Sequence, residues 1–140
     1  MGVLVSKKLF PIVIKYVELT LKNGQTGIFV IKTNEQEKKY AGRIKEMHTQ
    51  WRQPNWKESN DLFKGSLQWD AYKGEREIDP ITYRSMTLEE NLKHWDVIDD
   101  DGKPVPCTKE NMWKLDVNIA AALIDAFNAH TIPNEDELKN

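Results

Sequence analysis

A long apolar stretch near the end of the chain places the strongest constraint on the fold. Between residues 117 and 129 the polar side chains are Asn118, Asp125 and Asn128, and the remaining positions are aliphatic residues, alanine and one phenylalanine. On a helix with 3.6 residues per turn, these polar residues cover only a narrow stripe. We therefore expect a helix at 117–129 that is buried on more than one side. Its cover has to come from a sheet and a helix of the same chain or from a partner.

Residues 17–31 carry the pattern of a β-hairpin. Apolar and polar side chains alternate over 17–21, Asn23-Gly24 is typical of a two-residue loop, and residues 28–31 are β-branched or aromatic. Such a loop predicts one core face formed by Val17, Leu19, Leu21, Ile28 and Val30. The opposite face then carries Tyr16, Phe29 and Ile31. That face is more apolar than a solvated surface needs, so we expect another layer or another chain to cover it.

Capping signals predict two helices in the middle of the chain. Thr33 followed by Gln36 is a capping box, and apolar residues recur at helical spacing as far as Trp51, which predicts a helix over 34–50. Thr87 with Glu90 is a second capping box. It predicts a short helix that ends near His94.

Two further caps precede the C-terminus. Thr108 can cap a turn of helix that runs through Lys114, and Asp116 can cap the apolar helix. Pro133 and the acidic residues after it stop that helix, so we expect a frayed tail at about residues 133–140.

Residues 50–85 show no sustained period of 2 or 3.6. Tryptophans and tyrosines are scattered among glycines and prolines, which predicts an irregular insertion with a short strand at 81–83. Aromatic and basic residues together could stack on single-stranded nucleic acid. However, residues 50–79 carry five basic and six acidic residues, and the whole chain has a net charge of −2. This balance argues against nucleic-acid binding.

The acidic segment "WDVIDDDGKPVPC" can be compared with the ligand pattern of a calcium-binding loop. If Gly102 is placed at the glycine position of a calcium-binding loop, Asp99 and Asp101 supply two ligands, but Val97 and Thr108 fall where two others are required. The segment therefore predicts a tight turn at Asp101-Gly102 and no metal. The prolines of residues 103–107 cannot donate ladder hydrogen bonds, so this run is expected to be an edge strand or a rigid extended segment.

Residue types that carry catalysis are sparse and dispersed. The single Cys107 lies between Pro106 and a capping threonine, and each of the three histidines stands alone near the end of a predicted helix. Known nucleophile, phosphate-binding and zinc motifs do not occur in the sequence. We predict that the chain is not an enzyme and needs no cofactor.

Length and the order of the elements predict the fold class. A chain of 140 residues can bury one substantial core. We expect a single α+β domain in which an N-terminal antiparallel hairpin or small sheet packs with three to four helices. The start of the chain fits a short myristoylation pattern at Gly2, but an ordinary strand-forming N-terminus explains it better, and membrane association is not expected.

The segment "LKHWDVIDDDGKPVPCTKENMWKL" and the helix after it resemble a pattern in tail assembly proteins of long-tailed bacteriophages. The matching features are Trp95, the turn at Asp101-Gly102, the Lys-Pro-x-Pro run at 103–106, the cap at 108–111, Leu115 and the helix at 117–129. The hairpin "VELTLKNGQTGIFVIK" is similar to the N-terminal half of such proteins. The resemblance covers about fifty residues well.

This resemblance implies a non-enzymatic chaperone in the cytoplasm of a bacterial host. Such a protein binds the tape-measure protein, keeps it from aggregating and delivers it to tail-tube subunits. Two alternatives stay open: a minor structural protein of the virion, and a small nucleic-acid-binding or regulatory protein. A homo-oligomer also stays open. The candidate contact residues for a protein partner are Trp95, Val105, Trp113, Ile124, Phe29 and Ile31.

Overall fold

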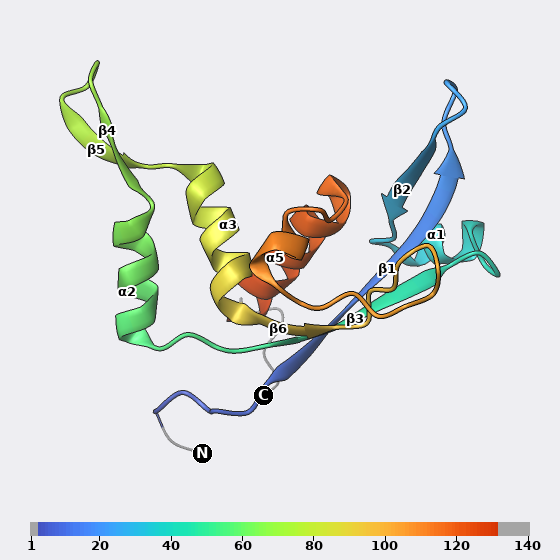
Figure 1. Cartoon of the computed structure of the whole chain (residues 1–140), viewed down its shortest axis with the longest axis horizontal. Helices are drawn as coiled ribbons and strands as arrows, with labels where there is room; N and C mark the ends of the chain where they lie inside the picture. The colour runs from blue at the N-terminus through green and yellow to red at the C-terminus, as the bar shows by residue number, and fades with distance from the viewer. Residues whose placement is uncertain (1–2, 132–140) are drawn as a thin grey trace.

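The computed structural model describes residues 3–131, which form an antiparallel sheet with helices packed against it (Figure 1). The strand order in the sheet is β2-β1-β3-β6. Its strands are β1 (Phe10–Thr20), β2 (Thr26–Val30), β3 (Lys45–Trp51) and β6 (Leu92–Trp95). The α+β class predicted from the sequence is confirmed.

Helices and a second, smaller sheet complete the described part of the chain. The helices are α1 (Asn34–Lys39), α2 (Trp56–Gly65), α3 (Pro80–Asn91), α4 (Lys109–Met112) and α5 (Val117–Thr131). The hairpin of β4 (Leu67–Asp70) and β5 (Glu75–Ile78) connects α2 to α3 and projects beyond them (Figure 1).

The core lies between one face of the sheet and α5. Ile12 and Ile14 of β1 stand opposite Thr49 and Met47 of β3. Strand residues two apart point to the same face, so these four side chains share one face of the sheet. All four are buried. From the other side, α5 contributes its buried residues Ile119, Leu123, Ile124 and Phe127. The expectation that this helix is buried on more than one side is therefore met by the chain's own sheet and helices.

Aromatic stacking and two hydrogen bonds fix the end of β3 in this core. The ring of Trp51 is fully buried and stacks on Phe127, with 5.0 Å between the ring centroids. Its Nε1–H donates to Oγ1 of Thr49 at 2.7 Å, and that hydroxyl donates to the backbone oxygen of Ile12 at 2.7 Å. Buried polar groups destabilise a fold unless they are paired, and these hydrogen bonds remove that cost.

The register of the β1–β2 hairpin differs from the prediction by one residue. Thr20 pairs with Thr26 and Val17 with Phe29, and the N–H of Leu21 donates to the oxygen of Gln25 at 2.7 Å. The loop therefore holds residues 22–24, with Gly24 at φ +84°. A glycine in the left-handed region closes three-residue hairpin loops of this kind, so Asn23-Gly24 indicated a hairpin but not its register.

A shift of one residue exchanges the faces of the side chains. Ile28 and Val30 lie with Tyr16 and pack against the core beneath α5, whereas Val17 lies on the other face with Phe29. The predicted grouping of Val17 with Ile28 and Val30 was wrong.

The chain itself supplies cover for that other face. Lys15 of β1 forms an ion pair with Glu37 of α1 at 2.9 Å, and Tyr40 packs on Phe29 with 5.7 Å between the ring centroids. Val17 and Ile31 are buried there, whereas Phe29 keeps 36% of its surface exposed.

The helix predicted over residues 34–50 is much shorter. Thr33 and Gln36 do form the predicted capping box, but α1 ends at Lys39. Gly42 follows at φ +84°, and residues 45–51 form β3, in which residues 47, 49 and 51 are buried. Met47 and Trp51 are four residues apart, so within β3 they fit period 2 as well as period 3.6, and the positive φ at Gly42 ends the helical path.

The segment at 50–85, expected to be irregular, contains regular structure. Asn55 and Glu58 form a capping box at the start of α2, and Asp79 caps α3 with Pro80 in its first turn. Residues 81–83 belong to α3, so the predicted short strand there was wrong. Both caps are visible in the sequence and predict these helix starts, although the scattered aromatic residues favoured an irregular segment.

The short helix predicted to start after Thr87 and to end near His94 had wrong bounds, although residues 88–91 are helical. Thr87 lies inside α3, where its hydroxyl donates to the oxygen of Tyr83 at 2.8 Å instead of capping a helix. The helix ends at Asn91, and β6 follows directly. Threonine within a helix commonly bonds back one turn in this way, so the Thr87–Glu90 spacing was not a start signal.

The predicted caps in the C-terminal part are confirmed. Oγ1 of Thr108 accepts from the N–H of Asn111 at the start of α4, and Oδ1 of Asp116 accepts from the N–H of Asn118 at the start of α5. The tail predicted at 133–140 and the pattern at Gly2 lie outside the described residues.

The predicted turn at Asp101-Gly102 is confirmed as well. Ile98 and Pro104 form an antiparallel bridge, the N–H of Val105 donates to the oxygen of Val97 at 2.9 Å, and Gly102 has φ +78°. Oδ1 of Asp99 accepts from the backbone N–H of Asp101 and of Lys103 at 2.9 Å each.

We predict that Leu123→Ala lowers the free energy of unfolding by about 2–5 kcal/mol, because it opens a cavity in the core. Leu123 is fully buried, whereas Leu4 is 89% exposed, so Leu4→Ala is the matched control and should change stability by less than about 0.5 kcal/mol. Urea denaturation measures both. Equal effects of the two substitutions would contradict the assigned core.

A second prediction concerns the backbone at Gly102. Gly102→Val should destabilise the fold by about 1 kcal/mol or more, because a β-branched residue resists positive φ, and Gly102→Asn should cost less. A Cβ at this position would meet nothing within 4 Å, so steric overlap does not confound the comparison. Equal urea midpoints for both variants would show that the turn is misassigned.

Candidate functional site

Two of the six candidate contact residues meet at a hollow between α3, α4 and α5. Trp113 follows α4 and is 65% exposed, while Ile124 of α5 is buried at the base of the hollow. The indole Nε1–H of Trp113 donates to Oε1 of Glu89 on α3 at 2.8 Å, which fixes the orientation of the ring. The structure therefore brings these two residues together, with Trp113 at the rim and Ile124 beneath it.

The other four candidate contact residues lie outside this hollow. Nε1–H of Trp95 donates to the backbone oxygen of Val105 at 2.6 Å, and both residues are half-buried, so this pair holds the segment after the turn against the sheet. Phe29 and Ile31 lie on the face of the sheet that α1 partly covers.

We call the hollow between α3, α4 and α5 the apolar groove. It has a volume of about 350 Å³, and its principal apolar residues are Ile81, Leu88, Trp113, Leu115, Val117 and Ile124. Ala120 and Ala121 of α5 also line it, and their short side chains leave it unfilled. Arg84 and Glu89 contribute charges of both signs. The groove can therefore take apolar side chains and offers polar groups that could orient them.

Exposure at the rim makes the groove unusual for a small domain. Ile81 is 71% exposed, Trp113 65% and Val117 75%. Single exposed apolar residues are common on protein surfaces, but several around one hollow are typical of an interaction site. The contribution of Ile81 was missed because residues 81–83 were predicted to be a strand; the Asp79-Pro80 start signal could have placed Ile81 on a helix.

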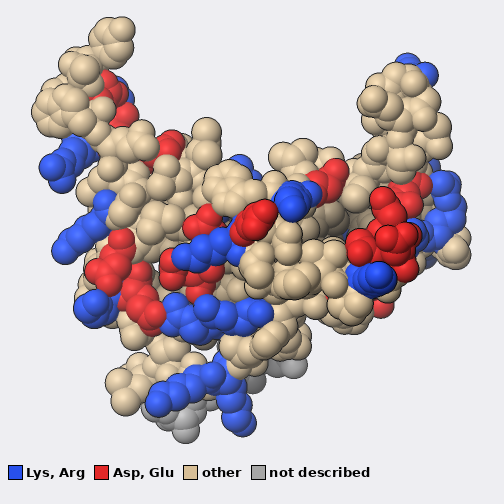
Figure 2. Space-filling view, viewed as in Figure 1, with Lys and Arg blue, Asp and Glu red and all other residues tan. Residues whose placement is uncertain are grey.

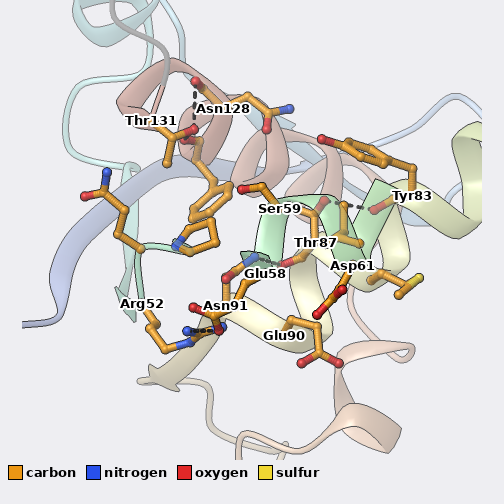
Figure 3. Close-up of a pocket in the computed structure, with 15 residues that line it drawn as sticks. Arg52, Glu58, Ser59, Asp61, Tyr83, Thr87, Glu90, Asn91, Asn128 and Thr131 are labelled. Atoms are coloured by element: carbon orange, nitrogen blue, oxygen red, sulfur yellow. Dashed lines mark hydrogen bonds and ion pairs between the residues drawn. The ribbon is translucent and has the colours of Figure 1, made fainter. Parts of the chain in front are cut away.

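A second hollow, which we call the polar cavity, lies between α2, α3 and the C-terminal part of α5 (Figure 3). It has a volume of about 510 Å³. Its charged lining residues are Arg52, Glu58, Asp61 and Glu90, and its apolar ones include Leu62, Met86 and Phe127. This cavity could not be predicted from the sequence, because part of its wall comes from the segment at 50–85 that was expected to be irregular.

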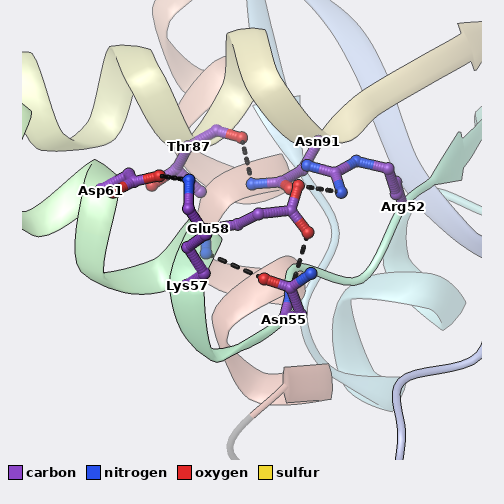
Figure 4. Close-up of polar contacts among 7 residues, drawn as sticks. All are labelled: Arg52, Asn55, Lys57, Glu58, Asp61, Thr87 and Asn91. Atoms are coloured by element: carbon purple, nitrogen blue, oxygen red, sulfur yellow. Dashed lines mark hydrogen bonds and ion pairs between the residues drawn. The ribbon is translucent and has the colours of Figure 1, made fainter.

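An ion pair between Arg52 and Glu58 forms part of the wall of the polar cavity (Figure 4). The Glu58 carboxylate also accepts from the backbone N–H of Asn55 at 3.2 Å. The Asn55 hydrogen bond, followed by the Arg52 guanidinium, holds the pKa of Glu58 below its usual range. Glu58 is therefore suited to fix the start of α2 and not to act as an acid at neutral pH.

Asn91 is the most deeply buried polar residue of this cavity. It is 1% exposed, and its Nδ2 donates to the backbone oxygen of Thr87 at 3.0 Å (Figure 4). Its Oδ1 is buried and has no hydrogen-bond partner among the described residues. A buried acceptor without a donor destabilises the folded state and calls for an explanation.

Asp99 and Cys107 are the residues that the sequence connects with metal binding and with nucleophilic catalysis. The Asp99 carboxylate accepts backbone N–H groups of its own turn, and residues 3–131 contain no cluster of three or more histidine, cysteine or acidic residues that could hold a metal ion. Burial raises the pKa of the Cys107 thiol, which disfavours the nucleophilic thiolate. The prediction that the chain is not an enzyme stays a prediction.

The histidine positions were predicted correctly in one case of three. His130 lies in the last turn of α5 and stacks on Phe10, with 3.8 Å between the ring centroids. His48 and His94 belong to β3 and β6 instead of helix ends.

Surface charge and helix length bear on the class of partner. On the face in Figure 2, acidic and basic side chains are interspersed instead of forming one basic patch. Among residues 3–131, no helix has the length and apolar character needed to cross a membrane. Comparisons of the chain with protein-family models, with curated proteins and with solved structures gave no match.

Proposed function

We propose that the chain is a non-enzymatic protein-binding module whose apolar groove receives apolar side chains of a partner helix. The observation that carries the proposal is the exposure of Ile81, Trp113 and Val117 around one hollow. An amphipathic helix that lays its apolar face into such a groove buries these side chains. The burial of one large apolar side chain contributes about 1.5–3 kcal/mol.

We further propose that the partner is the tape-measure protein of a long-tailed bacteriophage, bound in the host cytoplasm before delivery to tail-tube subunits. The support is the resemblance in sequence between residues 92 and 129. Part of that stretch also builds the groove, since Trp113, Leu115 and the residues of α5 line it. The resemblance and the exposed surface thus coincide in the same part of the chain.

The dimensions of the groove suit transient binding. A groove of about 350 Å³ accommodates a few side chains, and the entropy lost on association offsets much of the gain from their burial. A chaperone that must hand over its cargo requires release as well as capture. Rapid dissociation is therefore an expected property of this module.

We predict that Val117→Glu abolishes co-purification with helical tape-measure fragments, because it places a charge at the rim of the groove. The fold should persist, since Val117 is 75% exposed and an acidic residue is favourable in the first turn of a helix. Val3→Glu adds the same charge at a fully exposed residue outside the groove and should leave binding unchanged.

Retained binding in a folded Val117→Glu protein would refute the groove as the contact surface. Mass spectrometry of purified particles tests the assembly role separately. A chaperone should be absent from the finished particle, whereas a stoichiometric presence would identify the chain as a structural component instead.

A further inference from the structure

The polar cavity is distinct from the apolar groove, because α3 separates them. Tyr83, Thr87 and Asn91 face the cavity, whereas Ile81 and Leu88 face the groove. Figure 3 shows the Asn91 side chain beside Arg52, among the polar residues that line the cavity. Asn91 lines the cavity, so a donor for its unpaired Oδ1 can come from that side.

Charge in the cavity favours a cation. Among residues 3–131, three carboxylates, those of Glu58, Asp61 and Glu90, line it against the single guanidinium of Arg52. Glu58 is engaged by Arg52, but the other two carboxylates have only exposed lysine partners, at 3.1 Å from Asp61 and 3.7 Å from Glu90. Surface pairs of this kind contribute little and exchange readily, so these carboxylates are available to a ligand.

The other residues that line the polar cavity indicate which class of cation fits it. Leu62, Met86 and Phe127 provide an apolar wall that fits a hydrocarbon stem. A metal ion is a poor fit, because the residues described contain no group of three acidic, histidine or cysteine ligands that could hold one. A carboxamide oxygen beside carboxylates instead matches a group that carries several N–H donors.

We infer that the polar cavity binds an organic cation: a guanidinium or ammonium group on a short apolar stem. Its N–H donates to Oδ1 of Asn91, its charge is balanced by Glu90 and Asp61, and its stem lies along Met86 and Phe127. Because Oδ1 is buried, this binding mode requires the Arg52 side chain, which lies beside Asn91 in Figure 4, to move aside when the ligand enters. This inference does not depend on the proposed function.

The test is a titration of the purified chain, followed by NMR of backbone and side-chain amides. The probes are agmatine, a capped arginine amide and the corresponding citrulline amide, in which a neutral urea replaces the guanidinium. We expect saturable shifts at residues of α2 and α3, including the side-chain amide of Asn91, with the two cations and not with citrulline. Binding of agmatine but not of the capped arginine amide would identify the ligand as a small-molecule amine. Binding of both would extend the site to arginine side chains of peptides.

Three variants make the test specific. Asn91→Leu removes the acceptor and should weaken binding by roughly tenfold or more. Glu90→Gln should also weaken it, whereas Glu110→Gln, which removes a carboxylate that is 84% exposed and outside the cavity, should not. If Asn91→Leu does not fold, the comparison of Glu90→Gln with Glu110→Gln decides the question. Equal binding by those two variants, binding of citrulline comparable to that of arginine, or no saturable binding by the wild type would overturn the inference.

Discussion

The packing of Phe127 against Trp51 and Phe10 holds the sheet and α5 together. The three rings stack at centroid distances of 5.0 and 5.9 Å and join α5 to the ends of both central strands. Trp51 can occupy this place only when β3 is in register with β1, and the hydrogen bonds through Thr49 to Ile12 reinforce that register. The sheet, its register and the position of α5 are therefore one cooperative unit.

The position of α5 in turn produces both hollows. Its N-terminal half, through Val117 and Ile124, lines the apolar groove, whereas its C-terminal half, through Phe127 and Thr131, lines the polar cavity. Between β3 and β6, the chain leaves the sheet to form α2, the β4–β5 hairpin and α3 (Figure 1). Helix α3 returns across α5 and divides the space beside it into one apolar and one charged compartment.

Local signals predicted the elements whose form depends on nearby residues. The caps at Thr33, Thr108 and Asp116 and the turn at Gly102 were recognised because each is decided within a few residues. The prediction for residues 40–51 failed because Met47 and Trp51, four residues apart, satisfy both periods. The choice between helix and strand depends on pairing with β1, which lies far away in the sequence. The hairpin register failed because Gly24 closes a three-residue loop as readily as a two-residue one.

The candidate site was predictable only in part, for the same reason. Trp113 and Ile124 were identified from their residue type and helical position, but their meeting with Ile81 depends on how α3 packs, which a single sequence does not show. The pairing of Trp95 with Val105 was hidden because it is a hydrogen bond from a side chain to the backbone. Asn91 gave no signal at all, because its unpaired oxygen is a property of the packed structure.

Hydrogen–deuterium exchange of the chain, alone and with a helical tape-measure fragment, is the decisive measurement for the apolar groove as a binding surface. We expect slower exchange on binding in the parts of α3, α4 and α5 that line the groove, because a bound helix excludes water from them. Exchange in the β1–β2 hairpin should not change. Protection confined to that hairpin or to the β4–β5 hairpin, with no change around the groove, would contradict the assignment.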